Sequence, residues 1–147
     1  MKTNLEICID SCSGIDAAVE GGADRIELCS SLEYGGLTPT IEVLKHASEC
    51  GIQARSMIRP RKGDFVYSLE ELKKMQSDID MVRSFNIDGV VFGATLPNGS
   101  LDQDLLEELI SYSVDLKKTL HRAVDTLPKT KDSVQIGIQL GFDTILS

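Results

Sequence analysis

Leu5-Glu-Ile-Cys-Ile-Asp10 and Arg25-Ile-Glu-Leu-Cys29 are two stretches in which apolar and polar residues alternate strictly. Successive side chains of a strand point to opposite faces, so each stretch predicts a β-strand with one apolar and one polar face. A segment with helical periodicity follows each, which indicates parallel strands joined by helices. Parallel strands are normally apolar on both faces, so the face that carries Glu, Cys, Asp and Arg departs from the rule and is a candidate functional region.

The rest of the chain continues the alternation of strand and helix. A helix capped by Ser11 or Ser13 is predicted after the first strand, and Thr38-Pro39 is predicted to begin the second helix. Ser68-Leu-Glu-Glu71 is a capping box, and Leu69 is among the residues that the helix behind it is expected to bury. Further helices are expected from 102 and over 134–140, and further strands over 53–58, 89–93, 116–124 and 142–147.

An incomplete (β/α)8 barrel of the TIM type is favoured over a doubly wound sheet. No Gly-x-Gly-x-x-Gly follows the first strand, as a dinucleotide-binding sheet would require. Polar residues such as Arg55 and Arg59 recur on one face of several strands, and closing the sheet would turn these faces into a polar lumen. Complete barrels need about 200 residues or more. Residues 1–147 are therefore expected to form a single domain with about six strands and five helices, truncated at the C-terminus.

The composition argues against several classes of protein. The net charge of -8 disfavours nucleic acid as a partner, because phosphate binding needs a basic surface. No apolar run approaches the ~18 residues of a membrane span, and no signal peptide is expected before the first strand. Four cysteines without a secretory signal indicate a reducing, cytoplasmic setting in which thiols stay free or bind metal.

Cys8 and Cys29 are the candidate metal ligands. They are predicted on the same face of neighbouring strands about 4.8 Å apart, each two residues after a glutamate. Two converging thiolates form a soft site that selects Cu(I) over hard cations. The stagger of barrel strands leaves open whether the two sulfurs are level, and the alternative is that both cysteines pack as small hydrophobes. Cys12 is a weaker third candidate, whereas Cys50 is expected to be structural and His46 solvated.

Charged side chains form a second candidate site at the carboxyl ends of the strands, where the active sites of barrels lie. Arg59 and Arg61 could together hold a phosphate or carboxylate. His121 is expected to face the lumen and to move protons near neutral pH, with Glu6 or Glu27 as its partner. The alternative is that the charges form a structural network of ion pairs that fills the lumen.

Several motifs carry a resemblance to a known family: Glu6-x-Cys8-x-Asp10-Ser11, Gly21-Gly-Ala-Asp-Arg-Ile-Glu-Leu-Cys29, Met57-Ile-Arg-Pro-Arg-x-Gly-Asp64, Gly89-Val-Val-Phe-Gly93 and His121-Arg-Ala. On these the chain resembles the CutC copper-homeostasis proteins over its whole length. The resemblance implies a (β/α)8 barrel, which agrees with the pattern of strands and helices. It also implies Cu(I) as the bound ion, with Cys8 and Cys29 as its ligands.

Two functions from different classes follow. The first is a cytoplasmic copper-homeostasis protein that binds Cu(I) through Cys8 and Cys29. The second is a barrel enzyme that performs acid–base chemistry on a small anionic substrate, with His121, Glu6 and Glu27 as catalytic residues and Arg59 and Arg61 binding the anion. Whether the protein is an enzyme is left open. The expected partners are a copper ion, a small anionic metabolite in the second hypothesis, and further copies of the chain, because the outer strands of an incomplete barrel lack neighbours.

Overall fold

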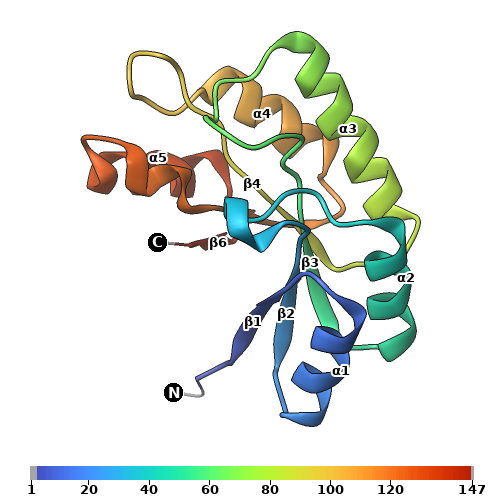
Figure 1. The fold of residues 1–147 in the computed structure, drawn as a ribbon. Helices are drawn as coiled ribbons and strands as arrows, with labels where there is room; N and C mark the ends of the chain where they lie inside the picture. The colour runs from blue at the N-terminus through green and yellow to red at the C-terminus, as the bar shows by residue number, and fades with distance from the viewer. Residues whose placement is uncertain (1–2, 147) are drawn as a thin grey trace.

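The computed structural model describes residues 3–146 and consists of parallel strands that alternate with helices (Figure 1). Its strands are β1 (Glu6–Ile9), β2 (Arg25–Leu28), β3 (Gln53–Met57), β4 (Gly89–Phe92), β5 (Lys117–Leu120) and β6 (Thr144–Ile145). Its α-helices are α1 (Cys12–Glu20), α2 (Ile41–Cys50), α3 (Leu69–Arg83), α4 (Gln103–Tyr112) and α5 (Thr130–Leu140). Two short 3₁₀-helices, η1 (Leu32–Tyr34) and η2 (Arg122–Thr126), follow β2 and β5.

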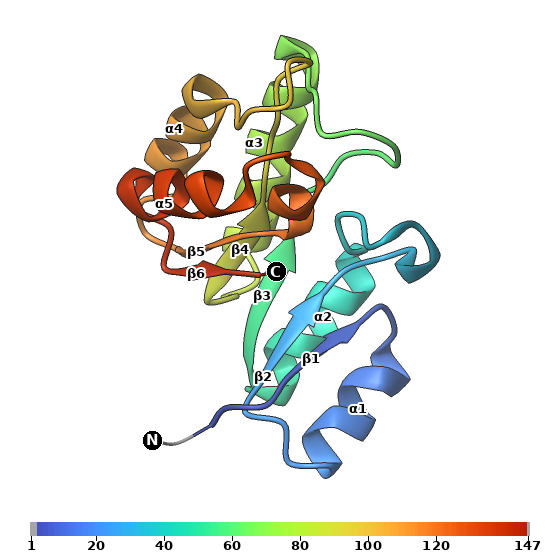
Figure 2. The same cartoon turned by 90° about the vertical axis from the view of Figure 1, so that its left-hand side faces the viewer.

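The strands of the described residues form one sheet in the order β1-β2-β3-β4-β5-β6, and every neighbouring pair is parallel. The sheet twists as it runs from β1 to β6, as parallel sheets do, and the helices pack along it (Figure 2). Sequential parallel strands joined by helices are the arrangement of a TIM-type (β/α)8 barrel. The predicted fold class, with six strands and five α-helices, is confirmed for residues 3–146.

The hydrophobic core lies between the sheet and the helices, and α3 illustrates how the sequence builds it. Leu72, Met75, Ile79 and Val82 recur at helical spacing and are buried. The expected burial of Leu69 was wrong: as the first residue of the helix it faces solvent, with 77% of its surface exposed. No helix within residues 3–146 has the length and apolar character needed to cross a membrane.

Side-chain caps set the beginnings of the helices, with one difference from the prediction. Ser11 caps α1, and Ser68 forms the predicted capping box at α3. The cap of α2 is Thr40 and not Thr38, because the Thr40 hydroxyl accepts the hydrogen bond from the backbone of the third helical residue. The Thr38 hydroxyl instead donates to the buried carboxylate of Asp78, 3.1 Å away, which ties this loop to α3.

Strand β5 is shorter than predicted and ends at Leu120, before His121. The His121 side chain accepts a hydrogen bond from the backbone of Ala123 at 3.1 Å, and this bond begins the turn of η2. His121 therefore lies just past the carboxyl end of β5. The predicted sixth strand is shorter as well, with β6 confined to Thr144–Ile145, and the end of its expected range at Ser147 lies outside the described residues.

Candidate functional site

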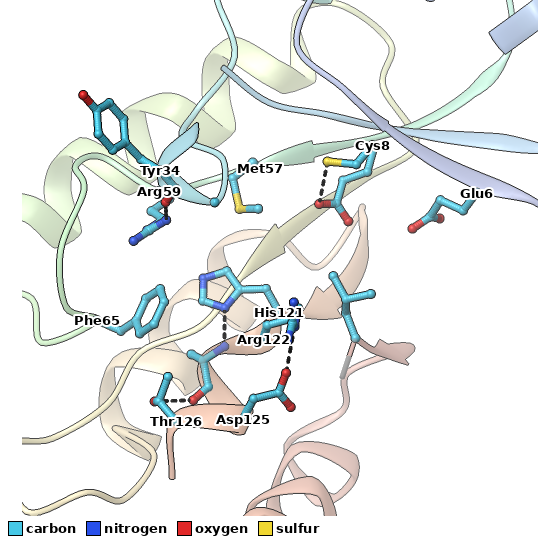
Figure 3. Close-up of a pocket in the computed structure, with 14 residues that line it drawn as sticks. Glu6, Cys8, Tyr34, Met57, Arg59, Phe65, His121, Arg122, Asp125 and Thr126 are labelled. Carbon is cyan, nitrogen blue, oxygen red and sulfur yellow. Dashed lines mark hydrogen bonds and ion pairs between the residues drawn. The ribbon is translucent and has the colours of Figure 1, made fainter. Parts of the chain in front are cut away.

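A cavity of about 530 Å³ lies at the carboxyl ends of the strands (Figure 3). Its volume falls within the roughly 300–1,000 Å³ of small-molecule sites, and its position is that of the active sites of TIM barrels. Five of the predicted site residues line it: Glu6, Cys8, Glu27, Arg59 and His121.

Cys8 and Cys29 are brought together at one wall of this cavity. In the register of β1 and β2, Cys8 lies opposite Glu27, and Cys29 follows two positions later on the same face. The sulfur atoms of the two cysteines are 3.7 Å apart, and the Cys8 thiol also donates a hydrogen bond of 3.7 Å to the Glu27 carboxylate. Cys8 lines the cavity, whereas Cys29 is fully buried behind it. The stagger of the strands therefore does not separate the two sulfurs.

The loop that contains η1 covers Cys29. Gly36 has φ +88°, and a Cβ atom at this position would lie 3.2 Å from Cys29 Cβ and 3.4 Å from its Sγ. Met57 also packs against Cys29 and extends into the cavity, as Figure 3 shows. Cys29 is thus accompanied by the Met57 thioether and covered by the backbone at Gly36, whereas Cys8 is exposed and lines the cavity.

The surroundings of Cys29 and Glu27 favour their protonated forms. The hydrogen bond with Cys8, together with burial, raises the pKa of Cys29 well above its usual range. Burial raises the pKa of Glu27 to about 7, and the neighbouring charge of Glu6 acts in the same direction. Near neutral pH Glu27 can therefore both release and accept a proton, beside a thiol that it already contacts.

His121 is buried and neutral at physiological pH. Burial lowers its pKa to about 4, and its ring lies 4.9 Å from the ring of Phe65. Gly93 allows the close approach of the imidazole, because a Cβ atom there would lie 2.7 Å from it. Since Nδ1 accepts the Ala123 N–H, Nε2 carries the proton, and among residues 3–146 this buried donor has no acceptor.

The predicted pairing of His121 with Glu6 or Glu27 is not found in the described part of the chain. Glu6 forms an ion pair with Arg25 on the adjacent strand, and Glu27 accepts from Cys8. The short β5 turns the chain into η2 at His121, so the imidazole is held by its own turn and not by a carboxylate on another strand.

Arg59 holds together the two loops above the cavity. Its guanidinium donates to the backbone oxygens of Tyr34 at 2.8 Å, Gly36 at 3.2 Å and Gly63 at 2.9 Å, and it lies 4.8 Å from the centre of the Phe65 ring. Within residues 3–146 its buried Nε has no hydrogen-bond partner. Arg59 therefore lines the cavity with one unused donor, while most of its hydrogen-bonding capacity serves the loops.

Arg61 lies apart from the cavity. Its guanidinium forms ion pairs with Glu71 and with Asp64, the latter at 3.0 Å, and it lies over the ring of Tyr67. Of the two arginines predicted to bind an anion, Arg59 lines the cavity, whereas Arg61 is engaged by carboxylates and is not among the lining residues.

Several residues that line the cavity were missed by the sequence reasoning. Tyr34, Phe65 and Thr126 come from loops and 3₁₀-turns, where no periodic pattern reports on orientation. Phe65 directly follows the motif that ends at Asp64, which was the one available signal for it. Arg122 and Asp125 also line the cavity and form an ion pair of 2.8 Å, and Asp125 is one of the charged residues that the sequence predicts near this end of the strands.

The fold and the cavity define this chain as a protein of the TIM-barrel class with its candidate site at the carboxyl ends of the strands. The model of the CutC family matches residues 3–147, and the chain belongs to this family.

Its relatives agree. A CutC protein of Agrobacterium fabrum is 46% identical over 143 residues, which cover 97% of this chain and 57% of that protein. One of Caulobacter vibrioides is 43% identical, with coverage of 97% and 58%. The crystal structure of CutC from Streptococcus agalactiae, which is described as a copper homeostasis protein, superposes with a TM-score of 0.89 at 33% identity. The superposition covers 97% of this chain and 71% of the other. The chain thus spans 57–58% of the length of the Agrobacterium fabrum and Caulobacter vibrioides relatives.

Proposed function

We propose that this protein acts in copper homeostasis by binding Cu(I) through Cys8 and Cys29 in the reducing environment of the cytoplasm. The observation that carries the proposal is the sulfur pair, with 3.7 Å between the two Sγ atoms. Membership of the CutC family and the copper-homeostasis name of the Streptococcus agalactiae relative add support.

The donor set suits a soft metal ion. Thiolate and thioether sulfurs select Cu(I) over hard cations, and the Met57 side chain packs directly against Cys29. Metal–thiolate bonds are about 2.3 Å long in zinc sites, so sulfurs at the observed separation need little movement to share one ion. The ion would reach Cys8 from the cavity, while Cys29 is closed off from solvent.

Glu27 gives the thiols a route for proton release. A thiol must lose its proton to bind the metal, so binding is coupled to pH. The Cys8 thiol already donates to the Glu27 carboxylate, and the pKa of Glu27, raised to about 7 by burial, matches proton transfer near neutral pH. We expect Cu(I) affinity to fall as pH decreases, because protons compete for sulfur.

An anaerobic Cu(I) titration against a colorimetric chelator tests the proposal. We expect the chain to bind one equivalent tightly and to lose this binding in Cys8→Ser and in Cys29→Ser. Cys50→Ser is the matched control, because Cys50 lies at the end of α2 and outside the cavity. Far-UV circular dichroism checks that each variant is folded. Unchanged affinity in the Cys8→Ser/Cys29→Ser double variant contradicts the proposal.

A second candidate function is acid–base catalysis on a small anionic substrate. The observation in its favour is that two buried N–H donors of cavity residues, Arg59 Nε and His121 Nε2, have no acceptor within residues 3–146. Buried donors are normally satisfied, so both fit the oxygens of a carboxylate or phosphate. Glu27, with its pKa near neutrality, is then the proton carrier, whereas His121 serves as a neutral donor.

A thermal-shift screen of small phosphates and carboxylates tests this candidate. A ligand at one hundred times its dissociation constant stabilises the folded state by roughly 2.7 kcal/mol. Arg59→Ala should remove the shift, while Arg61→Ala, which alters an arginine outside the cavity, should keep it. A screen in which no anion stabilises the protein counts against the enzyme.

A further inference from the structure

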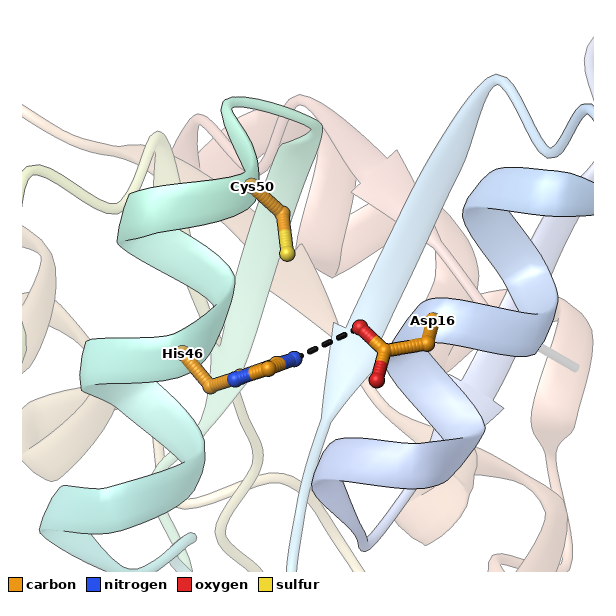
Figure 4. Close-up of side chains that lie close together, drawn as sticks. All are labelled: Asp16, His46 and Cys50. Atoms are coloured by element: carbon orange, nitrogen blue, oxygen red, sulfur yellow. Dashed lines mark hydrogen bonds and ion pairs between the residues drawn. The ribbon is translucent and has the colours of Figure 1, made fainter.

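A second group of metal-ligating side chains lies on the outer surface, between α1 and α2 (Figure 4). Asp16 comes from α1, and His46 and Cys50 come from α2. His46 and Cys50 are four residues apart, so they lie on one face of their helix, and this face is turned toward Asp16. The two helices pack against each other directly.

The three side chains converge. His46 Nε2 lies 2.7 Å from the Asp16 carboxylate, and the ligand atoms of all three residues lie within 4.8 Å of one another. We propose that Asp16, His46 and Cys50 form a binding site for a divalent transition-metal ion of the zinc class, separate from the cysteine pair of the cavity.

The chemistry of the donors points to this class of ion. One carboxylate, one imidazole and one thiolate are all ligands that Zn²⁺ accepts, and three protein ligands leave a fourth tetrahedral position for water. Mg²⁺ and Ca²⁺ prefer sites made only of oxygen, and Cu(I) prefers sulfur. With metal–ligand bonds of about 2.0–2.3 Å, the ligands of a tetrahedral site are about 3.3–3.8 Å apart. The observed cluster needs only small side-chain movements to reach this geometry.

The local field favours a cation. Cys50 is the last residue of α2, where the helix dipole places partial negative charge. A cation bound here would neutralise part of the negative charge of Asp16 and of the carboxyl end of α2.

A purely structural ion pair between Asp16 and His46 is the competing explanation, and it gives Cys50 no role. The experiment therefore concerns the thiolate. In the Cys8→Ser/Cys29→Ser background, the protein is titrated with Co²⁺, a spectroscopic substitute for Zn²⁺, and the Co²⁺ is then displaced with Zn²⁺. We expect one equivalent of Co²⁺ with a thiolate-to-metal charge-transfer band, and loss of that band on addition of Zn²⁺.

Cys50→Ser and His46→Gln should each weaken metal binding by at least about tenfold, since removal of even a supporting residue costs 10–100-fold. The amide introduced by His46→Gln keeps a donor for Asp16, so this variant removes the metal ligand while it retains a link between the helices. Lys45→Ala, a change to an exposed neighbour on α2, should leave affinity unchanged. If the Cys8→Ser/Cys29→Ser background does not fold, Co²⁺ binding is compared between the wild type and Cys50→Ser. The Cys50→Ser variant should then bind one equivalent of Co²⁺ fewer than the wild type. Absence of the charge-transfer band, or an affinity that neither Cys50→Ser nor His46→Gln reduces, overturns the site.

Discussion

The Cys8 and Cys29 sulfurs lie 3.7 Å apart, although 21 positions separate the two residues in the sequence. Pairing of β1 with β2 places Cys8 opposite Glu27, and the backbone N–H of Cys29 continues the ladder by donating to Ile9 at 2.9 Å. The thiol pair is therefore held by the ladder of two adjacent strands and not by a loop. The proposed Cu(I) site at this pair would therefore need little backbone rearrangement to bind the ion.

Gly36→Ala should destabilise the protein and weaken Cu(I) binding. Gly36 combines a positive φ with close contact to Cys29, so a methyl group is strained and also displaces the thiol. We expect a loss of about 1–3 kcal/mol in the free energy of unfolding, measured with urea. Gly51→Ala is the control, because Gly51 also has a positive φ but no atom lies within 4 Å of its Cβ position. Equal losses in the two variants would show that contact with Cys29 contributes nothing.

Glu27→Gln should change how stability depends on pH. The pKa of Glu27 is raised in the folded state from 4.5 to about 7, so the folded state holds the proton more tightly. Its contribution is present below pH 4.5 and is lost as the pH rises to about 7. Relative to the wild type, the variant should gain up to about 3 kcal/mol over this interval. Urea unfolding at both ends of the interval measures the difference, and parallel pH profiles would refute the expectation.

His121→Gln should have the opposite effect on the pH profile. Burial lowers the pKa of His121 from 6.5 to about 4, so the folded state binds this proton less tightly than the unfolded state. The wild type therefore loses up to about 3 kcal/mol as the pH falls through this range, and the variant is spared that loss. NMR titration of the imidazole provides a direct check. A pKa near 6.5 in the folded protein would contradict the inferred burial.

The chain should self-associate in solution. Within residues 3–146, β1 pairs only with β2 and β6 only with β5, which leaves two strand edges open to another chain. Sedimentation velocity over a range of concentrations should show dimers or larger species. Leu5→Lys places a charge beside the β1 edge, and it should shift the distribution toward monomer; Leu5 is already half exposed, so the fold should tolerate the change. A single monomeric species at all concentrations would rule the expectation out.

Local patterns in the sequence sufficed for most of the architecture. The strict alternation around Cys8 and Glu27 predicted which residues share a face, and the structure confirms it through the contacts between these side chains. Ser68 and Glu71 predicted the beginning of α3 correctly. These features depend on neighbours within a few residues, so the order of residue types is enough to specify them.

Contacts between distant segments decided the chemistry of the sites. The Arg59 guanidinium donates to loop carbonyls up to 25 positions away, and these contacts decide which of its donors is left unused. The low pKa of His121 results from burial, which no single segment of the chain produces. His46 was expected to be solvated and Cys50 structural, yet the packing of α2 on α1 places both beside Asp16, 30 residues before His46 in the chain. The sequence by itself determined the elements and their polar faces, because these follow from local spacing. Only the tertiary structure determined which donors meet, because meeting depends on strand register, loop closure and helix packing across the whole domain.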